Sequence, residues 1–449
     1  MTGLAAPRPA PAILVGSPLP RTILRLALPA VGSALLTLLF LLVDIFWVGR
    51  ILGASALAAV STAGFAVWIL AARGVMSAVG VTAVAARRHG EGAHGLAAVV
   101  AGSTLMVALG FGIVVAALGW RLVPGLFALM HTPADVTDLG RLYLTTYLLG
   151  TPLLFGFFAC EATFRASGDT RTPLALLATS VALNVILDPL LITGAGPLPA
   201  LGIAGAAAAA IFTRGTVLAL GFVILVRRRL VRLSVFDFRS AMAALRVGLP
   251  VAANGIFFSL VYIGLTRITT RFGVPALAAL GIGHKLEGLS YMVATGFGLA
   301  SAAIVGQNLG AGRPDRARAA GWMTSSYACA AGSVVALAFL AFPETMVGIF
   351  THDPGVIADG SMYLRAMAIV QITMGLEIVL EASLGGAGFT ALPMLWSGLF
   401  TAARIPLAAW LVGPLGLAGV WWALAVTAVA RGIAMAVLWR GGRWERVRA

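Results

Sequence analysis

The sequence predicts an all-α membrane protein with twelve transmembrane helices in two pseudo-symmetric six-helix bundles. Its composition is the first reason, because 60% of the residues are hydrophobic and only 10% are charged, whereas soluble domains carry roughly 25% charged residues. The second reason is length, because a hydrocarbon core ~30 Å thick needs about 20 apolar residues per helix, and 449 residues provide a dozen such segments. The third is an internal repeat. The short alternating segments of a membrane β-barrel are absent from the pattern.

Twelve apolar segments give the expected helices, and arginine, proline and glycine punctuate the gaps between them. Each segment is long enough to cross the hydrocarbon core as a helix. In the first half we expect helices at 22–48, 55–82, 96–120, 139–163, 173–195 and 201–226. In the second half we expect them at 246–268, 277–305, 320–343, 361–385, 392–413 and 415–439.

These helices define the expected domain organisation. A first lobe and a second lobe of six helices each are joined by an arginine-rich linker and flanked by short tails. The boundaries are 1–20 for the cytoplasmic tail, 21–226 for the N-lobe, 227–245 for the cytoplasmic linker, 246–439 for the C-lobe and 440–449 for the second cytoplasmic tail.

The net charge of +15 orients the chain in the membrane and does not indicate a nucleic-acid partner. Arginines outside the spans gather on one side, as the positive-inside rule describes for cytoplasmic loops. We therefore expect a multi-pass protein of the inner or plasma membrane, with both termini in the cytoplasm. The opposite side receives only Arg50, Arg121, Arg141, Arg267 and Arg271.

The internal repeat relates the two halves of the chain. LRLALP from Leu24 returns as LRVGLP from Leu245 (245 − 24 = 221), and the loop GEG at Gly90 returns as GAG at Gly310 (310 − 90 = 220). Landmarks in one order at nearly one spacing indicate duplication of a six-helix unit. Since six crossings return the chain to its starting side, the halves should be related by an axis along the membrane normal.

Asp44 is a charged residue within the first apolar segment. A charge at the centre of the bilayer costs about 2.5–3.5 kcal/mol on insertion scales, so such residues are candidates for function. The alternative is a packing role, in which the Asp44 carboxylate accepts a hydrogen bond from a neighbouring helix.

Asn184 and Asp188 form a second candidate in the fifth helix, within SVALNVILDPLL. Their spacing of four residues places both side chains on one helical face. Pro189 follows and lacks an N–H, which leaves the carbonyl of Val185 without its helical partner. These oxygens can hold a proton or a small hard cation. If Asp188 faces Asp44, one proton or one Na⁺ ion could be shared between them. The alternative is an Asn–Asp pair that only stabilises helix packing.

The second half lacks this acidic set but carries other ionisable residues within its helices. Glu287, Glu377 and Arg404 are candidates for the substrate cleft, and structural ion pairing is an equal alternative. Arg404 could pair with Glu377 or Glu287. Phe157 in the first half is an aromatic candidate for the same cleft, although aromatic residues in membrane helices more often serve packing.

These residues carry a resemblance to a known family. The stretch LALPAVGSALLTLLFLLVDIFWVGRILGASALAAVS resembles the opening of the multidrug and toxic compound extrusion (MATE) transporters. The similarity continues through FRASGDTRTP, NVILDP, LGIAGAA, VGQNLGAGRPDRA and LGGAGFT, from about residue 21 to 439. NVILDP after a first-helix aspartate resembles the DinF-like branch.

The resemblance implies two six-helix lobes around a V-shaped cleft, and antiport of amphipathic or cationic compounds against H⁺ or Na⁺. It assigns the cation site to Asp44, Asn184 and Asp188. This sequence departs from the pattern at Ala210, where many members carry a hydroxyl residue, with Thr213 as the nearest substitute. The missing hydroxyl argues against Na⁺ more than against a proton.

The expected function is efflux by antiport with alternating access. The expected partners are small amphipathic or cationic substrates and the lipid bilayer, with the chain acting as a monomer and without a cofactor beyond H⁺ or Na⁺ as coupling ion. A lipid-linked oligosaccharide flippase of the same superfamily is the alternative, and a polytopic membrane enzyme is a weaker one. The chain has no HExxH or GxSxG motif, so we do not expect an enzyme.

Overall fold

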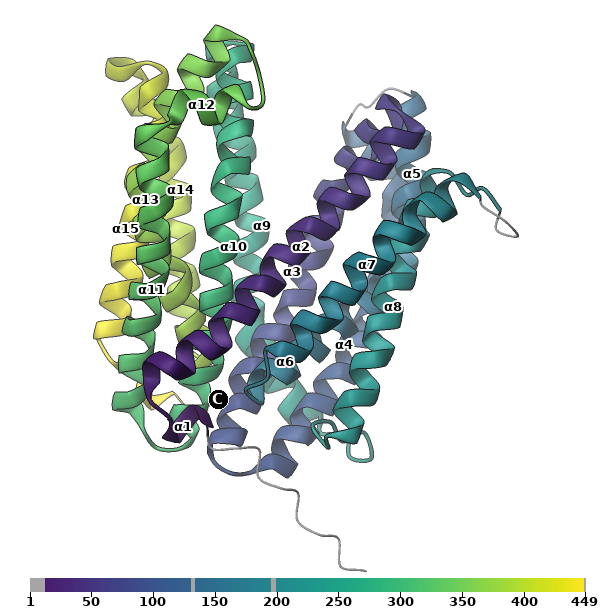
Figure 1. The fold of residues 1–449 in the computed structure, drawn as a ribbon, viewed down its shortest axis with the longest axis vertical. Helices are drawn as coiled ribbons and strands as arrows, with labels where there is room; N and C mark the ends of the chain where they lie inside the picture. The colour runs from purple at the N-terminus through teal and green to yellow at the C-terminus, as the bar shows by residue number, and fades with distance from the viewer. Residues whose placement is uncertain (1–12, 131–133, 195–198, 448–449) are drawn as a thin grey trace, which may run out of the picture.

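The computed structural model describes residues 13–130, 134–194 and 199–447, and every regular element in these ranges is a helix (Figure 1). The first half contains α1 (Ile13–Gly16), α2 (Leu19–Leu52), α3 (Ala54–Gly90), α4 (His94–Met130), α5 (Ala134–Leu149), α6 (Thr151–Ala166), α7 (Arg171–Thr193) and α8 (Ile203–Arg227). The second half contains α9 (Phe238–Thr269), η1 (Thr270–Phe272), α10 (Val274–Gly310), α11 (Pro314–Ala341), α12 (Pro343–Gly348), α13 (Pro354–Gly386), α14 (Ala391–Leu415), α15 (Leu417–Arg440) and η2 (Arg443–Arg446).

The expected twelve spans are confirmed, with one of them broken. Within the described residues, eleven helices are long and apolar enough to cross a membrane, and α5 with α6 makes a twelfth span bent by 51°. The break lies at Gly150, and Pro152 is the second residue of α6. Proline is tolerated there because the first helical N–H groups have no partner within the helix. The sequence predicted one continuous helix at 139–163 and did not predict this bend.

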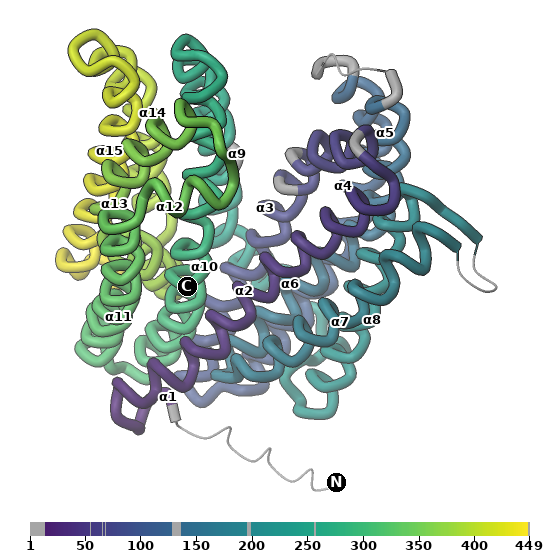
Figure 2. The backbone as a smooth tube through the Cα atoms, turned by 45° about the horizontal axis from the view of Figure 1, so that its top comes forward, coloured from purple at the N-terminus to yellow at the C-terminus, as the bar shows by residue number. Residues whose placement is uncertain are grey.

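Two lobes diverge from one end of the molecule in a V shape. Figures 1 and 2 show α2 to α8 forming one arm and α9 to α15 the other, with α1 at the end where the arms meet. We call this end the closed end, defined by Gly90, Ala166 and Gln307, at which residues of the two lobes contact each other. The fold thus places six spans in each lobe, as the repeat predicts.

Several helices extend beyond the hydrocarbon core. The helices α3, α4 and α10 each contain 37 residues, which at 1.5 Å per residue is about 55 Å. The helix α9 begins at Phe238, so residues expected in the linker up to 245 are helical. The Asp237 carboxylate caps this helix by accepting hydrogen bonds from the Arg239 backbone N–H at 3.0 Å and the Ser240 hydroxyl at 2.6 Å.

Glycine allows the lobes to approach at backbone distance. A Cβ atom placed on Gly80 of α3 would lie 2.0 Å from the carbonyl oxygen of Ala244, and one on Gly248 of α9 would lie 1.9 Å from that of Met76. No side chain fits at either position without moving backbone. The α3–α9 contact is therefore fixed by small residues, as is common where membrane helices pack closely.

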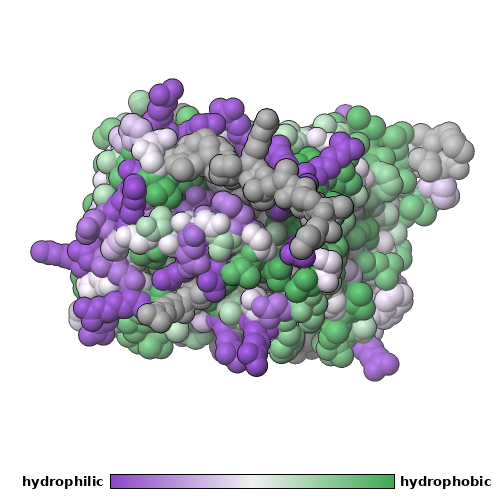
Figure 3. Space-filling model, turned by 90° about the horizontal axis from the view of Figure 1, so that it is seen from below, coloured by the Kyte–Doolittle hydropathy of each residue, from purple (hydrophilic) through white to green (hydrophobic). Residues whose placement is uncertain are grey.

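Both ends of the described chain lie at the closed end. The Asn308 side-chain amide donates to the carbonyl of Leu14 at 3.2 Å, and the Arg87 guanidinium donates to the carbonyl of Val447. The Gln307 amide donates to the carbonyl of Ala166 at 2.7 Å and thereby joins the lobes. Figure 3 shows hydrophilic side chains gathered on this face. Exposed arginines at this end include Arg227, Arg228, Arg229, Arg232, Arg239, Arg313 and Arg443.

Candidate functional site

Asp44 lies inside the N-lobe and not on its lipid surface. It sits on the buried face of α2 and is 5% exposed. The hydroxyl of Tyr143 on α5 donates a hydrogen bond to Oδ2 of Asp44 at 3.4 Å. The Asp44 carboxylate therefore links α2 to α5, the half of the broken span that precedes Gly150.

Asn184 and Asp188 lie on one face of α7, as their spacing predicts, and both are fully buried. The Asn184 side-chain amide donates to Oδ2 of Asp188 at 2.7 Å. Pro189 follows inside the helix. Sequence reasoning thus placed this pair correctly on one face.

Three oxygens of this set lack hydrogen-bond partners. Among the described residues, no donor reaches Oδ1 of Asp44, Oδ1 of Asn184 or Oδ1 of Asp188, although all three are buried. A buried acceptor without a partner costs about 1–3 kcal/mol, so the site is stabilised by any proton or cation that these oxygens bind. The carboxyl groups of Asp44 and Asp188 are near enough to interact electrostatically.

Tyr143 is the partner that sequence reasoning missed. Its ring stacks on that of Tyr147, with centroids 6.0 Å apart. Tyr143 is buried and Tyr147 is partly buried in the lobe beside α2 and α8. The signal that could have found them is their spacing of four residues, which places both on one helical face in the segment LYLTTYLL.

The hydroxyl that the resemblance leads us to expect on the sixth span is not replaced by a free one. Ala210 is buried, and the nearby Thr213 hydroxyl donates to the carbonyl of Ala210 at 3.0 Å. The described residues contain no group of three or more His, Cys, Asp or Glu side chains that could hold a metal ion. A cation at this site would be bound by the unpartnered Oδ1 atoms of Asp44, Asn184 and Asp188.

Phe157 lies in the core of the N-lobe, where it is 1% exposed. The guanidinium carbon of Arg214 on α8 lies 5.1 Å from the centre of its ring and 4.4 Å from that of Phe40 on α2. Phe157 therefore holds the Arg214 guanidinium against its ring face. A direct role for Phe157 in the substrate cleft stays a prediction.

The buried acid of the C-lobe pairs with a different arginine from the one expected. Glu377 on α13 forms its ion pair with Arg431 on α15, whose guanidinium also donates to the Thr401 hydroxyl at 3.0 Å. Arg404 instead donates to the Thr427 hydroxyl at 3.2 Å. The expected pairing of Arg404 with Glu377 is therefore wrong, because Arg431 occupies that position.

Glu287 on α10 also has a partner other than Arg404. It accepts a hydrogen bond from the Tyr363 hydroxyl on α13 at 3.0 Å. The guanidinium of Arg404 lies against the rings of Phe258 and Tyr262, at 5.5 and 5.7 Å from their centres. The second-half candidates thus gather inside the C-lobe, in a different lobe from Asp44 and its partners.

Comparison with known proteins agrees with the organisation of the chain in two halves. The MatE family model matches residues 29–190 and again residues 250–410, once in each half. A probable multidrug resistance protein NorM from Deinococcus radiodurans is 32% identical over 425 residues, covering 92% of this chain and 90% of that protein. Another from Thermotoga maritima is 26% identical, covering 95% and 93%.

Solved structures show the same fold. The MATE transporter VcmN of Vibrio cholerae in its bent form superposes with a TM-score of 0.89 at 21% identity, covering 95% of this chain and 97% of that one. A MOP superfamily transporter from Pyrococcus furiosus also gives a TM-score of 0.89 at 21% identity, covering 97% and 99%. With the family model matched in both halves and the two-lobed fold shared, this chain belongs to the MatE family and is a MATE transporter.

Proposed function

We propose that this transporter exports small amphipathic or cationic compounds in exchange for protons, which bind at a site made of Asp44, Asn184 and Asp188, on the carboxyl groups of Asp44 and Asp188. The observation that carries this proposal is the set of three buried oxygens without partners, one on each of these residues. Relatives named as multidrug resistance proteins support this class of substrate.

The site is connected to the parts of the N-lobe that can rearrange. Tyr143 joins Asp44 to α5, which is separated from α6 by the 51° bend at Gly150. The helix α2 contains Pro29, which removes one backbone hydrogen bond from the same helix. Protonation gives a carboxylate one O–H donor and removes its negative charge, while its other oxygen can still accept. The bonds from Tyr143 and Asn184 to the carboxyl groups then weaken, because they are no longer bonds to a charged group, and α2, α5 and α7 repack.

A proton suits these residues better than Na⁺. Hard cations prefer several oxygen ligands, and the described site offers only three unpartnered side-chain oxygens. The Thr213 hydroxyl donates within its own helix. Na⁺ as coupling ion is the outcome that the experiment below distinguishes.

The arginine distribution supports an orientation. The closed end carries both described chain ends and the exposed arginines of the α8–α9 connection, and positive residues favour the cytoplasmic side. We therefore place the closed end in the cytoplasm of a cell whose plasma or inner membrane holds the protein as a monomer.

Transport by purified protein in vesicles tests the proposal. A pH gradient and a Na⁺ gradient are imposed separately, and efflux of a cationic dye is recorded. We expect the pH gradient alone to drive efflux, and Asp44→Asn and Asp188→Asn to abolish it. Asp138→Asn is the control, because Asp138 is exposed on α5. Efflux driven only by Na⁺, or unchanged in both variants, would contradict proton coupling at this site.

An anionic substrate is a second candidate, favoured by a specific observation. Arg404 and Arg431 are buried inside the C-lobe, and a relative from Shewanella oneidensis that is 27% identical over 83% of both chains is named as an FAD transporter. FAD and the cationic dye are offered to the same vesicles. Uptake of FAD that Arg404→Gln removes, without dye transport, would favour this second function.

A further inference from the structure

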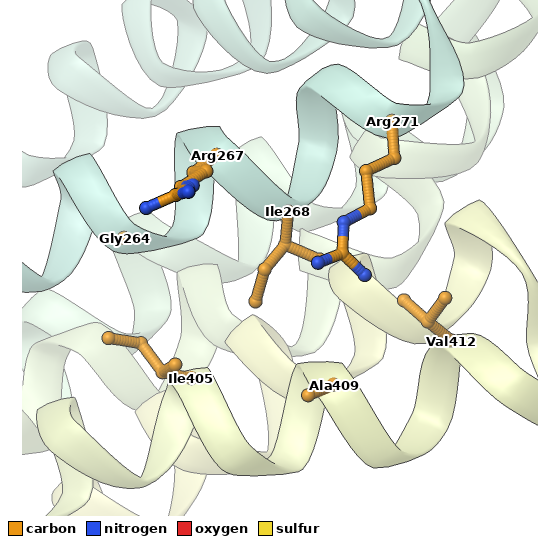
Figure 4. Close-up of a pocket in the computed structure, with 7 residues that line it drawn as sticks. All are labelled: Gly264, Arg267, Ile268, Arg271, Ile405, Ala409 and Val412. Carbon is orange, nitrogen blue, oxygen red and sulfur yellow. The ribbon is translucent and has the colours of Figure 1, made fainter.

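A hollow of about 330 Å³ lies between α9 and α14, outside the candidate cation site. Its floor is apolar and is formed by Gly264 of α9 with Ile405, Ala409 and Val412 of α14. Arg267 and Arg271 line its rim, and Figure 4 shows the Arg271 guanidinium reaching into the space between the two helices.

This hollow faces away from the interior of the C-lobe. On α9 the ring of Tyr262 and the side chain of Leu265 point inward, and on α14 so do Arg404 and Ala408. Each residue turns an α-helix by about 100°. Gly264 and Arg267 follow Tyr262 by two and five residues, so they lie on the opposite side of α9 from Tyr262. The hollow therefore opens on a surface of the C-lobe and not into its interior.

The surroundings of the hollow have the character of a lipid-facing surface. Ile263 on α9 is 66% exposed, and Trp410 on α14 is 71% exposed. Large apolar side chains exposed to this degree on a membrane helix contact lipid tails, and tryptophan is enriched near the headgroups. Arg267 and Arg271 lie at the end of α9 away from Phe238, which is the level of the opposite leaflet's headgroups.

The two arginines present a concentrated positive charge. They are four residues apart, Arg267 on α9 and Arg271 in the turn η1 that follows it, and both are exposed. Neither forms an ion pair with any acidic side chain in the described part of the chain. The dipole of a helix favours a cation near any helix C-terminus. That effect alone does not account for two arginines beside an apolar hollow.

We propose that this hollow binds an anionic phospholipid of the leaflet opposite the closed end. Arg267 and Arg271 bind the phosphate through charge-assisted hydrogen bonds, and one acyl chain lies along Gly264, Ile405 and Ala409. The bound lipid holds α9 against α14 on the outer side of the C-lobe.

The site belongs to the second half alone. At the repeat offset of 221, Arg271 corresponds to Arg50 (271 − 221 = 50), but Arg267 corresponds to Phe46 (267 − 221 = 46). The first half therefore lacks the pair of guanidinium groups. Arg50 provides a matched control, because it is exposed and occupies the equivalent place in α2.

Native mass spectrometry of the purified transporter tests this assignment, and it measures binding and not transport. The protein is titrated with phosphatidylglycerol and separately with phosphatidylcholine, and retained lipid is counted. We expect phosphatidylglycerol to bind preferentially. R267A/R271A should weaken its binding roughly thirtyfold, as expected for two arginines near an anionic headgroup, whereas Arg50→Ala should leave it unchanged.

A second variant tests the apolar floor with both arginines intact. Ala409→Phe should reduce phosphatidylglycerol retention, because the ring fills the space for the acyl chain. Inorganic phosphate in excess should not displace the lipid. Equal retention by wild type and R267A/R271A would overturn the proposal. So would displacement by inorganic phosphate together with no effect of Ala409→Phe, because the occupant would then be a free anion.

Discussion

Gly90 of α3 and Gly310 of α10 occupy equivalent positions in the two halves, and each faces the backbone of the other helix. A Cβ on Gly90 would lie 2.0 Å from the carbonyl oxygen of Gln307, and one on Gly310 would lie 2.0 Å from that of Arg87. Arg87 and Gln307 are themselves related by the repeat offset (307 − 87 = 220). The contact is therefore reciprocal, and it joins the lobes at the closed end.

The first prediction concerns this contact. Gly310→Ala should push α3 and α10 apart, because the added Cβ meets backbone that cannot rotate away. We expect a shift toward conformations that are open at this end, measured as a longer distance between spin labels placed on the two lobes. Gly95→Ala is the control, because no heavy atom lies within 4 Å of a Cβ at that position. An unchanged distance in Gly310→Ala would show that this crossing does not hold the end closed.

The second prediction concerns Tyr143→Phe. The change removes the donor to Asp44 and keeps the ring that stacks on Tyr147. Since a hydrogen bond to a charged group contributes about 1.5–3 kcal/mol, we expect coupled efflux to fall by roughly tenfold or more in a protein that still folds, with thermal unfolding lowered by the loss of this bond. Tyr147→Phe is the matched control, because its hydroxyl is not the donor to Asp44. Equal activity in both variants would remove Tyr143 from the mechanism.

The third prediction concerns the buried ion pair of Glu377 and Arg431, whose side chains are about one-tenth exposed. Removing one partner leaves an unpaired buried charge, so Arg431→Gln should destabilise the protein by about 3–5 kcal/mol. Glu377→Gln combined with Arg431→Gln should recover most of this loss, as measured by thermal unfolding in detergent.

The pair of Arg365 and Glu344 serves as the control for that measurement. Both of its side chains are more than half exposed, so Arg365→Gln should cost at most about 1 kcal/mol. An equal loss in Arg365→Gln and Arg431→Gln would contradict the role of burial. If the stability losses of Glu377→Gln and Arg431→Gln simply added in the double variant, the two side chains would not be energetically coupled.

The fourth prediction concerns pH and the loop between α6 and α7. Burial acts to raise the pKa of Asp169, but hydrogen bonds from Thr172 and from Arg228, the latter at 2.6 Å, outweigh it and lower the pKa. The folded state therefore binds the proton less tightly than the unfolded state. The resulting stability is present above the unfolded pKa of about 3.9 and is lost as the pH falls through the lower folded pKa.

Thermal unfolding against pH measures this contribution. Asp169→Asn should melt below wild type at pH 7, and the difference should shrink as the pH falls below about 4. Arg228→Gln removes one donor and should give a smaller difference at pH 7. A difference that is constant with pH would show that the charge of Asp169 does not stabilise the loop.

The helices and their pairing into halves could be predicted from the sequence, because both depend on local properties. Apolar length determines a span, and the offset of 220 to 221 residues relates the lobes. The Asn184–Asp188 bond was also predictable, because a spacing of four residues determines contact on a helix. In each case the signal lies in residues that are close together in the sequence or in a stretch of sequence that occurs twice.

Contacts between helices could not be predicted in this way. Tyr143 lies 99 residues from Asp44, and Arg431 lies on a different helix from Glu377, so their meeting depends on how whole helices are rotated. Periodicity gave no basis for choosing Arg431 over Arg404 as the partner of Glu377. The break at Gly150 had a local signal, because Gly150 and Pro152 flank Thr151, but the surrounding apolar run concealed it.

The most direct test of the account is proton movement driven by substrate. Vesicles containing the transporter are loaded with a cationic dye under zero membrane potential and without Na⁺, and their internal pH is recorded as the dye gradient discharges. We predict a pH change with the wild type and none with Asp44→Asn or Asp188→Asn. A pH change of wild-type size in both variants would contradict coupling through these two carboxyl groups.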